Sequence, residues 1–93
     1  MAQLNAVVYG QVQGVSYRAY AVDEARRLGL TGWVRNQADG TVQTTAVGPR
    51  TQLALFLAWL RRGSPAAQVT RVAFTIDEIE TETYTFFEVR RQP

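Results

Sequence analysis

Two short segments of this 93-residue chain combine residue types that suit phosphate chemistry. One covers residues 10–18, with the sequence GQVQGVSYR, and the other covers residues 32–36, with the sequence GWVRN. The first predicts a strand that passes through a glycine-containing loop into a helix, where backbone N–H groups can surround an anion. The second places a side-chain amide at the end of a strand, from which it can hold a water molecule against that anion. Together the two segments predict a site for phosphate chemistry.

The loop over residues 13–17 is expected to form the anion cradle, because Gly14 allows a close approach that a side chain would block. Arg18 follows in the first helical turn, from which its guanidinium can donate to two phosphate oxygens. An arginine there opposes the helix dipole by ~0.3–1 kcal/mol, a cost that a bound anion would reverse. The alternative is an ordinary surface arginine. The loop lacks the lysine and hydroxyl of a nucleotide-binding P-loop, so ATP binding is not expected.

Asn36 is the candidate for holding water, since it ends the second predicted strand beside a turn. A side-chain amide is both a donor and an acceptor, so it can orient water without removing its proton. The alternative is that this asparagine serves only the turn, where its residue type is common. Trp33 and Val34 are expected to pack in the core or over the site, not to contact a ligand.

The residue types that the chain lacks exclude several mechanisms. It has no cysteine and no histidine, and all ten of its basic residues are arginine. Disulfides, thiolate nucleophiles, phosphohistidine, serine–histidine triads, the usual zinc sites and a catalytic lysine are therefore excluded. We expect chemistry that uses arginine, carboxylates, hydroxyls, amides, backbone dipoles and water.

The missing histidine also bears on the leaving group. Cleavage of a simple phosphate ester needs a proton donor, and the usual donor is absent. An acyl phosphate releases a carboxylate, whose conjugate acid has a pKa of about 4, so it needs little or no general acid. Position, charge neutralisation and a held water can then suffice for phosphoryl transfer. The composition therefore favours carboxyl-phosphate anhydrides over esters.

Hydrophobic spacing predicts the elements that hold these residues. Strands are expected near residues 5–12, 33–36, 41–47, 72–76 and 84–90, and helices near residues 17–28 and 53–60. Tyr17, Tyr20 and Ala21 begin the apolar face of the first helix, which Gly29 ends. The order predicts an α+β ferredoxin-like β-α-β-β-α-β fold with a short final strand, its antiparallel sheet covered on one face by both helices. We expect one domain over residues 1–93.

Charge and hydropathy limit the partners and the location. The net charge of +2 is too small for a nucleic-acid footprint, and no run approaches the ~20 apolar residues that cross a bilayer. The first residues lack the pattern of a secretion signal. We expect a soluble, cytoplasmic monomer that acts on a small molecule, with no nucleic-acid or membrane partner.

The two segments resemble the hallmark of the acylphosphatase family, Gly-x-Val-Gln-Gly-Val-x-Phe-Arg followed by Gly-Trp-Val-[Arg/Lys]-Asn. The similarity continues through residues 39–42, 59–60 and 63–65, and so covers most of the chain. It implies a ferredoxin-like fold and the hydrolysis of acyl phosphates to a carboxylate and inorganic phosphate, with no metal and no cofactor. Gln11 stands where a basic residue is common in the family, and Tyr17 replaces the usual phenylalanine. The added hydroxyl of Tyr17 requires a partner if it is buried.

The resemblance also implies roles for individual residues. It assigns Arg18 to phosphate binding and Asn36 to orienting the attacking water. The phosphate loop is formed by backbone amides of the following residues: Gly14, Val15, Ser16, Tyr17 and Arg18. Thr41 is expected to hold Asn36 in position without contacting the substrate itself. Ser16 occupies a variable position, so we do not expect it to act as a nucleophile.

Three other groups of side chains are expected to have structural or solvated roles. They are the arginines Arg26, Arg27, Arg61, Arg62, Arg90 and Arg91, expected at the surface; the acidic residues of segment 77–82, expected in solvent; and Tyr84, Phe86 and Phe87, expected in the core. Two alternatives to an enzyme stay open: a phosphate-binding sensor module, and an RNA-binding domain of the same topology. The RNP signature of such RNA-binding domains is absent.

Overall fold

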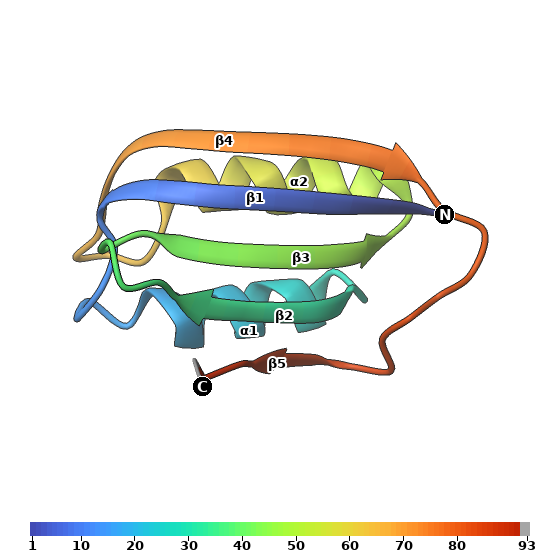
Figure 1. Ribbon diagram of the computed structural model, residues 1–93, viewed down its shortest axis with the longest axis horizontal. Helices are drawn as coiled ribbons and strands as arrows, with labels where there is room; N and C mark the ends of the chain where they lie inside the picture. Colours follow the sequence, from blue (N-terminus) through green and yellow to red (C-terminus); the bar gives the residue numbers. More distant parts are fainter. Residues whose placement is uncertain (92–93) are drawn as a thin grey trace.

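The computed structural model describes residues 1–91, which form a five-stranded sheet with two helices packed on one face (Figure 1). In chain order the elements are β1 (Ala2–Gln11), α1 (Tyr17–Arg27), β2 (Thr31–Asn36), β3 (Val42–Gly48), α2 (Arg50–Arg62), β4 (Gln68–Glu78) and β5 (Phe87–Val89). The predicted order of elements and the ferredoxin-like α+β fold are confirmed.

The sheet is mixed, with the strand order β4-β1-β3-β2-β5. Strands β1 to β4 pair antiparallel, as predicted, but β5 pairs parallel to β2. The path of the chain explains this difference. After β4 the chain passes along one end of the sheet to the opposite edge, so β5 must run in the same direction as β2 (Figure 1).

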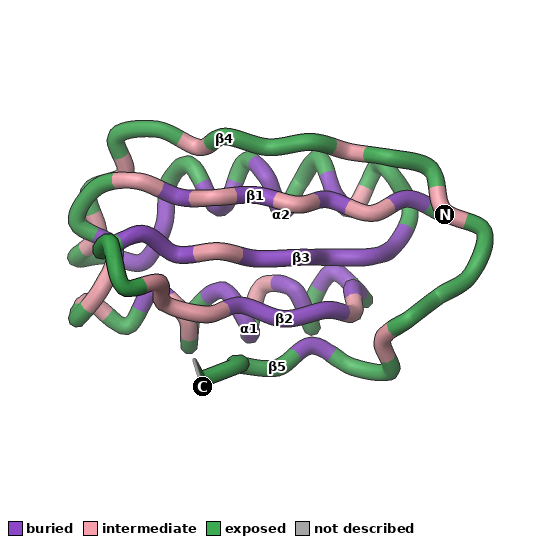
Figure 2. The backbone as a smooth tube through the Cα atoms, viewed as in Figure 1, coloured by how far each residue is buried: buried purple, intermediate pink, exposed green. Residues whose placement is uncertain are grey.

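The core lies between the sheet and the helices. Along the first eight residues of β1, burial alternates between buried and half-buried (Figure 2). The buried residues belong to the same core cluster as buried side chains of both helices. Helix α2 buries Leu53, Phe56 and Leu60 at the predicted spacing. The ring of Phe56 meets the buried ring of Phe87 edge to face, with centroids 5.7 Å apart, which joins β5 to the core.

Two expectations about aromatic packing are wrong. Tyr20 is 46% exposed, because the buried side of α1 runs through Tyr17, Ala21 and Val22 and leaves Tyr20 at its edge. Of the three aromatics expected in the core near the C-terminus, only Phe87 is buried. Phe86 is 59% exposed, because neighbouring residues on an extended chain point to opposite sides.

Three strands end at the same end of the sheet. There β1, β2 and β5 all finish, and α1 begins (Figure 1). The arrangement gathers the β1–α1 loop, the last residue of β2 and residues 90–91, which follow β5. Among residues 1–91, no helix is long and apolar enough to cross a membrane.

Candidate active site

The loop between β1 and α1 has an unusual backbone. Gly14 and Ser16 both have positive φ angles, of 76° and 60°. Serine rarely adopts this left-handed conformation, which costs a residue with a side chain roughly 1–2 kcal/mol. Such strain tends to occur where a loop must hold a particular shape for function.

The N-terminus of α1 is suited to an anion. Ser16 occupies the capping position but makes no side-chain capping hydrogen bond, and the first turn has no acidic residue. The first backbone N–H groups of a helix have no partner within the helix, and they carry the positive end of its dipole. An anionic ligand can therefore accept hydrogen bonds from these N–H groups and provide the negative charge that no capping side chain or carboxylate provides here.

Two side chains tie the loop to other parts of the fold. The Nε2 of Gln13 donates to the carbonyl oxygens of Gln37 at 2.8 Å and Thr41 at 2.9 Å, which ties the loop to the β2–β3 turn. The Oγ of Ser64 donates to the carbonyl oxygen of Val15 at 2.8 Å, which ties the loop to the segment after α2. Sequence reasoning did not identify either side chain as an anchor, because both contacts join residues more than 20 positions apart.

Tyr17 is buried beneath the loop. Its hydroxyl donates to the carbonyl oxygen of Leu60 at 2.7 Å, and its ring packs against Trp59 with centroids 5.2 Å apart. Burial raises the pKa of Tyr17, so its hydroxyl stays protonated. The departure from phenylalanine therefore adds a satisfied donor between α1 and α2, and the expectation that this hydroxyl needs a partner is confirmed.

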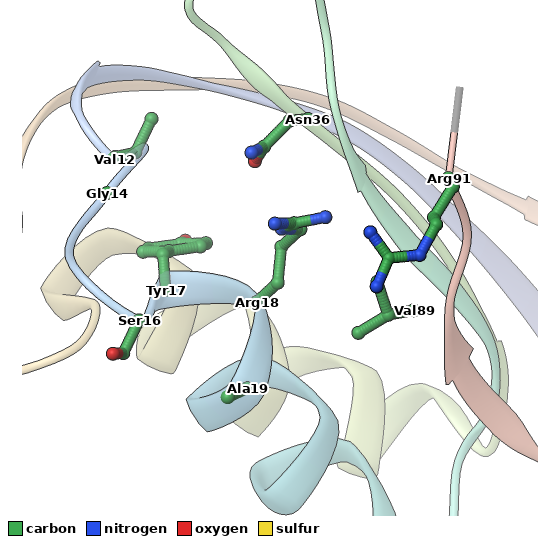
Figure 3. A pocket seen from close by; sticks show the side chains of 9 residues that line it. All are labelled: Val12, Gly14, Ser16, Tyr17, Arg18, Ala19, Asn36, Val89 and Arg91. Atoms are coloured by element: carbon green, nitrogen blue, oxygen red, sulfur yellow. The ribbon is translucent and has the colours of Figure 1, made fainter. Parts of the chain in front are cut away.

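A cavity of about 520 Å³ lies in front of the loop. Figure 3 shows Arg18 rising from α1 into this cavity and Asn36 projecting toward it from the end of β2. The hydroxyl of Ser16 points away from both. The structure thus brings Arg18, Asn36 and the glycine loop together, although Arg18 and Asn36 are separated by 17 residues along the chain.

The amide of Asn36 has an unmet hydrogen-bonding requirement. Its Oδ1 is buried, and no residue among 1–91 donates to it. A buried acceptor without a donor costs about 1–3 kcal/mol, so this side chain is not arranged for stability. Rotation of the side-chain amide exchanges its donor and acceptor ends, so either end can be presented to a ligand in the cavity.

Thr41 lies in the turn that follows Asn36. Its hydroxyl donates to the carboxylate of Asp39 at 2.6 Å and accepts from the Nε2 of Gln37 at 2.8 Å. The hydroxyl and the backbone N–H of Thr41 lower the pKa of Asp39. No hydrogen bond joins Thr41 to Asn36 within the described chain, so any support of Asn36 passes through the turn.

Four residues that the sequence did not assign to the site also line the cavity, and two of them, Val12 and Ala19, flank the predicted loop. The other two, Val89 in β5 and Arg91 just beyond it, line the side opposite the loop (Figure 3). Arg91 was expected at the solvated surface; it is exposed, and it also lines the cavity. Its place there depends on the pairing of β5 with β2, which places Val89 beside Val34. No local pattern in the sequence predicts that β5 pairs with β2.

Comparison with known proteins agrees with this geometry. The sequence model of the family described as acylphosphatase matches residues 4–89. An acylphosphatase of Anaeromyxobacter sp. (strain Fw109-5) is 54% identical over 72 residues, which cover 77% of each chain. Acylphosphatase-1 of Gallus gallus is 46% identical over 86 residues, covering 90% of this chain and 87% of the relative. The crystal structure of acylphosphatase from Bacillus subtilis is 36% identical, with a TM-score of 0.92 over 97% of this chain and 99% of that one. The chain therefore belongs to the acylphosphatase family.

Proposed function

We propose that this protein hydrolyses acyl phosphates to a carboxylate and inorganic phosphate by direct attack of water on phosphorus. The observation that carries the proposal is that Arg18 and Asn36 face one cavity at the uncapped N-terminus of α1. The phosphoryl group binds to the backbone amides of residues 14–18 and to the Arg18 guanidinium. Thr41 stabilises the turn behind Asn36.

The reaction requires little proton transfer. A bond forms between the water oxygen and phosphorus as the bond between phosphorus and the acyl oxygen breaks. The carboxylate departs with the electron pair, and it needs no general acid because its conjugate acid has a pKa of about 4. The protons of the water pass to the phosphate product and to solvent. Arg18 and the loop amides neutralise the charge on the transferring group, which is the main catalytic requirement in phosphoryl transfer.

Asn36 acts by positioning the attacking water and not by removing a proton from it. Its amide orients the attacking water opposite the departing carboxylate, and the unpartnered Oδ1 of this side chain supports the assignment. Loss of Arg18 should weaken substrate binding as well as turnover, whereas loss of Asn36 should mainly slow turnover.

Hydrolysis of benzoyl phosphate in the presence of a chelator tests the proposal. We expect the wild type to release inorganic phosphate, and Arg18→Ala to lose at least about 100-fold in kcat/KM. Arg62→Ala removes an exposed arginine outside the cavity and is the matched control. In ¹⁸O-labelled water, the label should enter phosphate. Label in benzoate, or near-normal turnover by Arg18→Ala, would contradict the proposal.

We further propose that the protein acts as a cytoplasmic monomer on a small-molecule substrate, and not on nucleic acid or a membrane. The support is that the fold of one chain brings Arg18, Asn36 and the glycine loop into one cavity, and that the net charge is only +2. Sedimentation of the active protein tests the monomer. Titration with single-stranded RNA across a range of salt concentrations tests nucleic-acid binding, and salt-dependent binding at micromolar concentration would contradict the proposal.

A further inference from the structure

We propose that Arg91 binds a second anionic group, on the acyl part of the substrate, and so favours acyl phosphates whose acyl chain ends in a carboxylate or phosphate. This inference rests on the proposed function and deepens it. Arg91 lies across the cavity from the phosphate loop, with Val89 beside it (Figure 3).

The cavity is large enough for more than a phosphoryl group. Its volume of about 520 Å³ falls within the ~300–1,000 Å³ of sites that enclose a whole small ligand. Arg18 and the start of α1 already provide for the phosphoryl group. Val89 offers an apolar surface for a short carbon chain, and the guanidinium of Arg91 lies beside it.

The positive charge of the residues lining the cavity favours a ligand that has more than one negative group. The nine described residues that line it include two arginines and no carboxylate. Figure 3 shows the guanidinium of Arg91 directed toward that of Arg18. Neither forms a salt bridge with a carboxylate in the part of the chain that the structure describes. Two like charges facing one cavity repel each other, and a ligand with an anionic group at each end relieves that repulsion.

Strand β5, which ends two residues before Arg91, is held by hydrogen bonds to two other elements. The Nε and a terminal nitrogen of Arg26 donate to the carbonyl oxygen of Phe87 at 3.1 and 2.9 Å. The backbone N–H of Arg90 donates to the carbonyl oxygen of Val34 at 2.8 Å. These contacts join β5 to α1 on one side and to β2 on the other, so Arg91 emerges from an anchored segment.

The two neighbouring arginines that follow β5 have different surroundings. Val89 and Arg91 both line the cavity, whereas the guanidinium of Arg90 lies over the ring of Trp33, 4.8 Å from its centroid. Arg90 is absent from the cavity lining. It therefore provides a control of equal charge at the next position in the chain.

The test compares two substrates of nearly equal shape, succinyl phosphate and butyryl phosphate, which differ by a terminal carboxylate in place of a methyl group. Arg91→Gln should lower the ratio of kcat/KM for succinyl phosphate over butyryl phosphate by about 10–100-fold, the worth of one charge-assisted hydrogen bond. Arg90→Gln should change that ratio by less than about 2-fold.

Other outcomes would overturn the inference. An equal loss on both substrates would place Arg91 on the phosphoryl group, and no change would place it outside the complex. If Arg90→Gln changed the ratio by the same amount, the effect would come from the net charge of the protein and not from a contact of Arg91 with the substrate. If the wild type hydrolyses neither substrate, the proposed function itself fails and the inference falls with it, a result distinct from the other three.

Discussion

The hydroxyl of Ser64 donates a hydrogen bond to the carbonyl oxygen of Val15, at 2.8 Å, across 49 positions of sequence. Ser64 is only 3% exposed, and Val15 lies between the two residues of the loop that have positive φ. The bond occupies the Val15 carbonyl with a donor from the segment after α2. The shape of the phosphate loop therefore depends on a contact with a distant part of the fold.

Ser64→Ala should remove this anchor. We expect the free energy of unfolding to fall by about 1–3 kcal/mol, because a part-buried carbonyl loses its donor. We also expect kcat/KM for benzoyl phosphate to fall by up to about 10-fold as the loop loosens. Urea unfolding and steady-state kinetics measure the two effects. Thr83→Ala removes an exposed hydroxyl as the control. A loss of stability with unchanged kcat/KM would show that the bond does not position the loop.

Ser16 should respond to substitution through its backbone. Ser16→Gly should raise the free energy of unfolding by up to about 1 kcal/mol, because glycine adopts a φ of 60° without strain. Ser16→Val should lower it by about 1–2 kcal/mol, because a β-branched residue disfavours that conformation. The midpoint and slope of urea unfolding check both changes. If the glycine variant is the less stable of the two, the loop is not strained at this position.

Tyr17→Phe should cost about 1 kcal/mol of stability at neutral pH, because the Leu60 carbonyl loses its donor. Activity should persist, since the Tyr17 hydroxyl donates to the Leu60 carbonyl and is therefore not needed for the ligand. The acylphosphatase assay and urea unfolding test the two statements. A variant as stable as the wild type would mean that the hydroxyl contributes nothing.

The same residue predicts a dependence of stability on alkaline pH. Burial raises the pKa of Tyr17, so the folded protein retains a proton that the unfolded chain releases above about pH 10. The associated stability is fully present below pH 10, and it falls by about 1.4 kcal/mol for each further pH unit until the folded-state pKa is reached. Tyr17→Phe should lack this component. Identical alkaline profiles for the two proteins would contradict the burial effect.

Asn36→Ala should leave stability unchanged or raise it by up to about 1 kcal/mol. The substitution removes a buried acceptor for which no residue among 1–91 provides a donor. Thermal and urea unfolding check this directly. A loss of more than about 1 kcal/mol would show that Asn36 is held by contacts that matter to the fold.

Much of the fold could be predicted from local patterns. The alternation along β1, the apolar spacing of Leu53, Phe56 and Leu60, and the glycine after each helix indicate their elements without knowledge of the tertiary structure. Strand β5 has only three residues, and its partner lies 55 positions away. Its position and direction follow from the path of the preceding segment, which no local pattern encodes.

Some residues of the candidate site could likewise be predicted from local sequence, and others could not. Arg18 and Asn36 belong to segments with distinctive residue spacing, so the sequence identified both as candidates for this cavity. The anchoring roles of Gln13 and Ser64 depend on carbonyl groups brought near by folding. The position of Arg91 at the cavity depends on the pairing of β5 with β2, so its residue type and neighbours in the sequence do not indicate it. Such contacts are invisible in the sequence because they join residues far apart along the chain.

Steady-state hydrolysis of benzoyl phosphate by Asn36→Ala, with inorganic phosphate as a competing ligand, tests the central claim most directly. The claim predicts that kcat falls by at least about 100-fold while the inhibition constant of phosphate changes by less than about 2-fold, because Asn36 positions the water and Arg18 binds the phosphoryl group. A folded Asn36→Ala protein with near-normal kcat would contradict the claim.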